Sequence, residues 1–136
     1  MVKEIVRDPL FLSMKSTPAG ISDVQTAMDL DETLTANRDR CVGMAANMIG
    51  VNKRIIVFND KGKNMIMLNP VIVKASGEYE ATEGCLSLDG ERKTKRFSKI
   101  QVRYNDLTMR EKTQTYSGWT AEIIQHEVDH LDGILI

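Results

Sequence analysis

The sequence predicts an α+β domain in which antiparallel strands pack around a C-terminal helix, with a second helix near the N-terminus. Three observations lead to this prediction. A helical pattern ends near residue 37, strand-like runs fill residues 54–116, and a second helical pattern begins near residue 119. The 136 residues fit one domain, residues 1–136, and are enough to build a hydrophobic core.

The first third of the chain is predicted to hold an irregular segment and then a helix. Residues 8–20 contain two prolines and a glycine, which interrupt regular structure. Ser22 or Asp23 is suited to cap a helix that runs to about Asn37. Residues 43–50 then form a stretch of small residues that begins and ends with glycine.

The middle of the chain is predicted to form short strands. Its runs are either apolar throughout or alternate between apolar and polar residues, as half-buried strands do. Asn69-Pro70 is expected to end one of them, because proline has no N–H for the ladder. The expected strands are Arg54–Asn59, Asn64–Leu68, Val71–Ala75, Lys99–Tyr104 and Thr113–Tyr116.

The last helix has recognisable signals at both ends. Ser117 or Gly118 opens a helical pattern that runs from residue 119 to about residue 130 or 131. Gly133 follows as the expected C′ residue, where a left-handed backbone conformation favours glycine.

Composition and charge exclude several classes of function. The net charge of −1 and a pI near 6.1 give no electrostatic footprint for nucleic-acid binding. The charged N-terminus does not resemble a signal peptide, and no apolar run approaches the roughly 20 residues of a membrane span. A cytoplasmic location is therefore expected, with Cys41 and Cys85 reduced rather than bridged.

The only two histidines of the chain lie four residues apart, in the run His126-Glu127-Val128-Asp129-His130. On a helix this spacing places both imidazoles on one face, where they can reach a single metal ion. Glu127 then lies close enough to act as a general base toward a water molecule. The alternative is that both histidines lie on the solvated face of a terminal helix. The pattern favours a metal site. The roles of Asp129 and Asp132 remain open, with a surface or capping role favoured for Asp132.

A metal site that keeps one position open for water needs a third protein ligand. No His, Glu or Cys follows His130, so this ligand has to come from an earlier part of the chain. Cys85 is the best candidate, since it lies among turn residues after a predicted strand and a thiolate binds Zn²⁺ or Fe²⁺ strongly. Taken alone, Cys85 would be interpreted as a small buried hydrophobe.

Two motifs give the chain a specific resemblance to the peptide deformylase family. Residues 126–133 match its His-Glu-x-Asp-His-Leu-x-Gly motif, and Glu83–Ser87 matches Glu-Gly-Cys-Leu-Ser in full. A third motif, Gly-x-Gly-Leu-Ala-Ala-x-Gln, is matched only in part at Cys41–Met48. In that segment Cys41 replaces a glycine and Met48 replaces the glutamine. Further along, Asp89 stands where many members have proline.

The resemblance implies a metal-dependent hydrolase that removes the formyl group from N-formylmethionine of new proteins. Cys85, His126 and His130 would hold Fe²⁺ in the cell, and often Zn²⁺, Ni²⁺ or Co²⁺ after purification. Glu127 would be the general base, and the Leu86 backbone N–H would donate to the oxyanion. The residues implied in the substrate cleft are Gly43, Ala45, Ala46 and Met48.

Met48 implies a slow enzyme, because a thioether cannot donate the hydrogen bond that the family's glutamine supplies. Asn47 is not expected to substitute, since a neighbouring side chain points elsewhere. One alternative is a deformylase-like protein that binds metal and formyl-peptides with little turnover. A metallopeptidase is the third interpretation, disfavoured by the missing downstream ligand. The expected partners are N-formylmethionyl peptides of nascent chains at the ribosome, without direct nucleic-acid binding or membrane binding.

Overall fold

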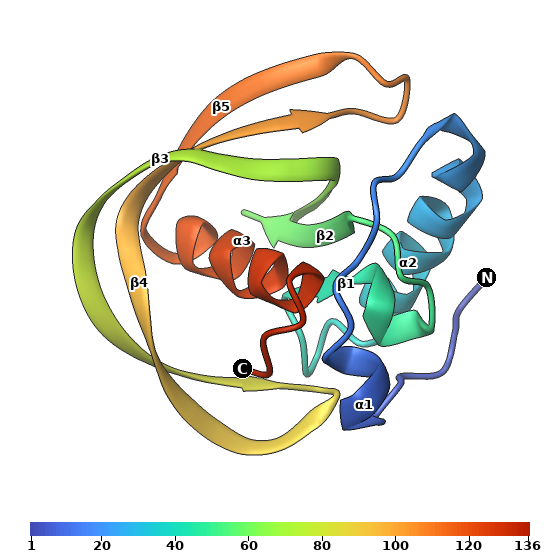
Figure 1. Ribbon diagram of the computed structural model, residues 1–136, viewed down its shortest axis with the longest axis horizontal. Helices are drawn as coiled ribbons and strands as arrows, with labels where there is room; N and C mark the ends of the chain where they lie inside the picture. Colours follow the sequence, from blue (N-terminus) through green and yellow to red (C-terminus); the bar gives the residue numbers. More distant parts are fainter.

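The computed structural model describes residues 1–136 and is built on one five-stranded antiparallel sheet in the order β1-β2-β3-β4-β5. Each strand therefore pairs with its neighbour in the chain. The predicted α+β architecture is confirmed (Figure 1). The strands are β1 Gly43–Ala45, β2 Ile55–Asp60, β3 Lys63–Cys85, β4 Leu88–Asn105 and β5 Glu111–Ser117. The helices are α1 Pro9–Leu12, α2 Val24–Ala36 and α3 Gly118–Leu131, with 3₁₀ turns η1 Ile21–Asp23 and η2 Ala46–Ile49.

Strand β2 is buried on both faces over its first four residues, which explains its continuous apolar run. Ile56 and Phe58 pack on the side of the sheet that α3 covers. Ile55 and Val57 point the other way and belong to a second core with Leu30 of α2. The sheet thus separates two helical layers, with α3 on one side and α2 on the other.

The longest strands, β3 and β4, form a curved ribbon that wraps around α3 (Figure 1). The prediction that Asn69-Pro70 ends a strand is wrong, because β3 runs through it to Cys85. The pairing register shifts between Leu68 and Val71, so the missing N–H of Pro70 falls within an irregularity of the ladder. Asn69 adopts a φ of 54° there, and its side-chain oxygen accepts a hydrogen bond from the Ala19 N–H at 2.8 Å.

The ribbon also extends further than the strands predicted from the sequence. Its outer part is polar and exposed, so it lacks the apolar residues on which the prediction was based. Cross-strand pairs of opposite charge join its strands, with Lys95 and Glu78 3.4 Å apart and Lys93 and Glu80 3.8 Å apart. Such residues give no apolar alternation, so the sequence pattern could not delimit β4, which begins eleven residues before Lys99, at Leu88.

The ends of the helices follow their local sequence. The segment predicted to be irregular contains the short helix α1, where the Asp8 carboxylate accepts a hydrogen bond from the Leu10 N–H and Pro9 takes the first position. The predicted role of Gly133 is confirmed. Its φ is 76°, and the N–H groups of Gly133 and Ile134 bond to carbonyls in the last turn of α3. None of the helices has the length and apolar character that a membrane crossing requires.

Candidate metal centre and active site

Cys85, His126 and His130 come together beside α3, as the sequence predicts. One ligand atom of each lies within 4.8 Å of the others, and the two histidine Nε2 atoms are 2.9 Å apart. The helical i, i+4 spacing aligns the histidines, whereas Cys85 arrives because the ribbon curves back around the helix. His126 and His130 are buried, so the alternative of a solvated face is excluded.

A buried chain of charges orients His126. Its Nδ1 lies 2.8 Å from Oε1 of Glu83, which leaves Nε2 facing the other ligand atoms. Glu83 is held in turn by two hydrogen bonds from Arg96, at 2.9 and 2.7 Å. Arg96 also donates to Asp129 at 2.6 Å, and this contact settles the role that the sequence left open for Asp129. The contacts of Glu83 with Arg96 and His126 were not predicted from the sequence, although Glu83 opens the Glu-Gly-Cys-Leu-Ser motif.

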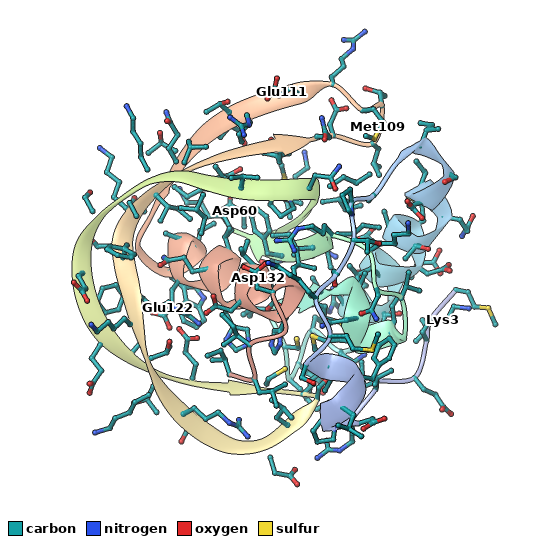
Figure 2. The ribbon with its side chains drawn as sticks, viewed as in Figure 1. Lys3, Asp60, Met109, Glu111, Glu122 and Asp132 are labelled. Atoms are coloured by element: carbon teal, nitrogen blue, oxygen red, sulfur yellow. The ribbon has the colours of Figure 1, made fainter.

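Asp132 is the C-cap residue of α3, at the C-terminal end of that helix (Figure 2). Its carboxylate accepts a hydrogen bond from Arg54 at 3.0 Å. The surface or capping role favoured from the sequence is therefore correct.

The electrostatics of the cluster suit a cation. Burial would lower the pKa of His126, but hydrogen bonds with Cys85 and Glu83 raise it to about 10. The same negative environment that retains a proton there favours a metal ion in competition with it. Burial and the neighbouring His126 lower the pKa of His130 to about 3, so its imidazole stays neutral, the form that ligates metals.

Glu127 is the second indication that the space beside Cys85, His126 and His130 is built to hold a bound group. It is buried, its Oε1 has no hydrogen-bond partner, and burial raises its pKa to about 7. A buried carboxylate oxygen without a partner is costly unless another group, such as a water molecule, occupies the adjacent space. The thiol and two imidazoles beside it form a donor set that fits Zn²⁺ or Fe²⁺ and leaves a further position open.

A cleft of about 530 Å³ opens over the cluster. Its walls include Gly43, Leu86, Trp119 and Glu127. Glu122, one turn before His126, faces the curved ribbon and accepts a hydrogen bond from the Tyr79 hydroxyl at 2.8 Å (Figure 2).

Of the residues predicted to line the cleft, only Gly43 does so directly. Ala45, Ala46 and Met48 are fully or almost fully buried beneath it and are not part of its wall. A Cβ atom on Gly43 would lie 2.8 Å from Ile123 Cγ2 and 2.9 Å from Glu127 Oε2. Glycine at this position therefore allows β1 to approach the buried carboxylate closely.

The rest of this segment explains what Asn47 and Cys41 do. The Asn47 amide donates to the His130 carbonyl at 2.8 Å and is fully buried, so it points away from the cleft, as predicted. Sδ of Met48 lies 3.5 Å from the Ala45 nitrogen. Cys41 is unpaired, as predicted; its thiol donates to the Gly43 carbonyl at 2.8 Å, and burial raises its pKa to about 12.

Comparison with known sequences gives a consistent result. The profile of the family described as "Polypeptide deformylase" matches residues 2–136. A peptide deformylase of Clostridium beijerinckii is 52% identical over 136 residues and covers 100% of both chains. One from Dictyoglomus thermophilum is 37% identical over 139 residues, covering 100% of this chain and 91% of the relative.

Solved structures agree with the sequence relatives. A peptide deformylase from Legionella pneumophila superposes with a TM-score of 0.88 at 34% identity, covering 99% of this chain and 83% of the other. A class I type b peptide deformylase from Acinetobacter baumannii with Met-Ala-Ser bound gives 0.89 at 26% identity, covering 99% and 97%. With its Cys/His/His cluster and full-length matches, the chain belongs to the polypeptide deformylase family, the metal-dependent hydrolases that remove the N-formyl group from peptides.

Proposed function

We propose that this protein hydrolyses the formyl group of N-formylmethionyl peptides with a divalent ion held by Cys85, His126 and His130. The observation that carries the proposal is the buried Cys/His/His cluster at the base of a cleft, next to a carboxylate oxygen without a partner. A cation in this position would supply positive charge that acidifies a water molecule. We assign Fe²⁺ as the native ion, with Zn²⁺, Ni²⁺ or Co²⁺ able to replace it, since a thiolate and two imidazoles accept all four.

Glu127 is assigned as the general base. It takes a proton from the attacking water as a bond forms between the water oxygen and the formyl carbon. It then delivers that proton to the amine nitrogen as the C–N bond breaks, and formate and a free N-terminus result. Burial of Glu127 raises its pKa to about 7, which suits a group that accepts and then returns a proton near neutral pH.

The oxyanion that forms on the formyl oxygen is assigned to the backbone N–H of Leu86, next to Cys85. The side chain at position 48 cannot assist, because a thioether has no donor. Asn47 cannot replace it while its amide is held by the His130 carbonyl. We therefore expect turnover below that of relatives with an amide at this position. Gly43, with Ala45, Ala46 and Met48 packed behind it, would shape the cleft for the peptide.

The substrate assignment draws support from the Acinetobacter baumannii relative, whose structure has Met-Ala-Ser bound. This tripeptide is what remains when formyl-Met-Ala-Ser loses its formyl group. We infer that the physiological substrates are nascent chains leaving the ribosome in the cytoplasm, with residues 1–136 acting as one domain.

A second candidate is a protein that binds metal and formyl-peptides with little turnover, which the missing donor at Met48 favours. Steady-state hydrolysis of formyl-Met-Ala-Ser by protein purified anaerobically separates the two, with metal content measured in parallel. We expect about one equivalent of metal and measurable formate release. Bound metal without formate release would support the binding protein.

The ligand assignment is tested by Cys85→Ser, which should lose most of the metal because a hydroxyl is a poor ligand for soft or borderline ions. Cys41→Ser is the matched control, since Cys41 donates to the Gly43 carbonyl instead of joining the cluster. Full metal occupancy in Cys85→Ser would reject Cys85 as a ligand.

A further inference from the structure

The turn that follows Cys85 carries the proposed oxyanion donor, and the β3–β4 ladder beside it is irregular. The segment Leu86–Asp89, here called the 86–89 turn, consists of the two residues between β3 and β4 and the first two residues of β4, and it contains no proline. Gly90 has a φ of 78°. The Cys85–Leu88 pair closes the turn, but the pairing register shifts between Gly84 and Cys85, so contacts from elsewhere can add to this irregular ladder in fixing the direction of the Leu86 N–H.

Arg7 supplies such contacts from a distant part of the chain. Its Nη1 donates to the Leu86 carbonyl at 2.9 Å, and its Nη2 donates to Oδ1 of Asp89 at 2.5 Å. One guanidinium therefore joins both ends of the 86–89 turn. Its planar shape and fixed donors make arginine suited to hold two acceptors in a defined geometry.

The backbone on both sides of Arg7 is itself anchored. The Val6 N–H donates to the Met48 carbonyl at 2.8 Å, and Asp8 caps α1. The guanidinium thus extends from a fixed base, so it can transmit that fixed position to the turn. The Arg7 side chain also lines the cleft.

A direct role in binding an anionic substrate group is less consistent with these contacts. Both terminal nitrogens of Arg7 are already engaged, and its charge is paired with Asp89. Both side chains are largely exposed, with 54% and 95% of their surfaces accessible, so the pair contributes little to overall stability. The contacts therefore point to local ordering of the turn.

We propose that Arg7 is a positioning residue, which braces the 86–89 turn so that the Leu86 N–H stays directed at the reacting formyl oxygen. The proposal rests on the proposed function for the role of that N–H. An oxyanion donor acts only when it is already aimed at the position of the developing charge. Loosening the turn should therefore reduce kcat and leave peptide binding largely intact.

The test compares Arg7→Met, which keeps the length of the side chain and removes both hydrogen bonds, with the parent. Arg103→Met is the matched control, because Arg103 forms a similarly exposed ion pair with Glu111 away from the cleft. The readouts are kcat and KM on formyl-Met-Ala-Ser, metal content, thermal melting and hydrogen exchange of the backbone amides of residues 85–90.

For Arg7→Met we expect exchange in residues 85–90 to become at least about tenfold faster, with unchanged exchange in β5. We expect kcat to fall about tenfold while KM stays within about twofold, with metal content and melting temperature retained. Arg103→Met should match the parent in all five measurements.

Unchanged exchange in residues 85–90 would overturn the proposal whatever the turnover. Faster exchange with unchanged kcat, or a loss confined to KM, would also overturn it, because the ordering of the turn would then not serve the chemistry. A parent that released no formate would instead reject the proposed function, and faster exchange in Arg7→Met would still show that Arg7 orders the turn.

Discussion

At the scale of single residues, Glu127 has the most specific chemical role. It is buried beside the candidate metal ligands, and one of its oxygens has no protein partner. Glu127→Gln should keep the metal, since Glu127 is not a ligand, and should reduce kcat/KM by about 10²–10⁴-fold, the usual contribution of a general base. Formate release and metal content measure both effects. Glu111→Gln on the exposed strand β5 is the control, and equal rates in parent and Glu127→Gln would refute the assigned base.

Met48 carries the second prediction at this scale. Met48→Gln introduces an amide donor where the family motif has glutamine, so kcat/KM should rise at least about tenfold, mainly through kcat. Because Met48 is almost fully buried, the amide should also cost roughly 1–3 kcal/mol of unfolding free energy if it finds no partner. Steady-state kinetics and urea unfolding measure the two effects. A variant with intact metal and no gain in rate would mean that another feature limits turnover.

At the scale of elements, α3 and the ribbon of β3 and β4 are joined by the buried Glu83–Arg96–Asp129 chain. Removing the shared cation leaves Asp129 without this partner and Glu83 with only His126, and breaking buried pairs in this way is strongly destabilising. Arg96→Met should therefore lower the free energy of unfolding by about 3–5 kcal/mol. Urea unfolding at neutral pH measures the change. Arg103→Met, at an exposed pair, should cost less than about 1 kcal/mol, and a similar cost for both variants would contradict the role of burial.

The same chain should affect metal binding, because Glu83 orients His126. Mutating a residue that hydrogen-bonds a metal-ligating histidine typically lowers metal affinity by about 10–100-fold. Weaker metal binding is therefore expected in Arg96→Met even under conditions where the variant is fully folded.

At the scale of the whole molecule, the three candidate ligands join the end of the curved ribbon to the C-terminal helix. An ion that binds only the folded state stabilises it by mass action, by about 2.7 kcal/mol at 100 times the dissociation constant. Removing the metal with a chelator should therefore lower the melting temperature by roughly 10 °C, given that 1 kcal/mol shifts a domain of this size by several degrees.

This metal-dependent increment should decrease as the pH falls, since protons compete for the thiolate and the imidazoles. Melting curves of metal-loaded and chelated protein across a pH series would show it. Equal melting temperatures at neutral pH would contradict a structural contribution from the ion.

Features that depend on local spacing could be predicted from the sequence alone. The prediction that His126 and His130 share one helix face next to Glu127 needed only the period of an α-helix. The prediction for Gly133 needed only the preference for glycine in the left-handed conformation that ends a helix such as α3. The apolar run of β2 predicted a strand, and the structure accounts for that run because both faces of β2 lie in a core. Cys85 followed from the need for a third ligand, and the family motifs supported it.

Features that join distant segments became visible only in the folded protein. Asn69-Pro70 did not end β3, because a register irregularity accommodates the missing N–H, and local propensity does not reveal such pairing. Arg96 and Asp129 are charged residues whose burial depends on how the ribbon curves over α3. Asn47 and Arg7 likewise gain their roles from partners 83 and 79 residues away. Periodicity reports which face of an element is buried, whereas the partner of a polar side chain is fixed only when the sheet brings the elements together.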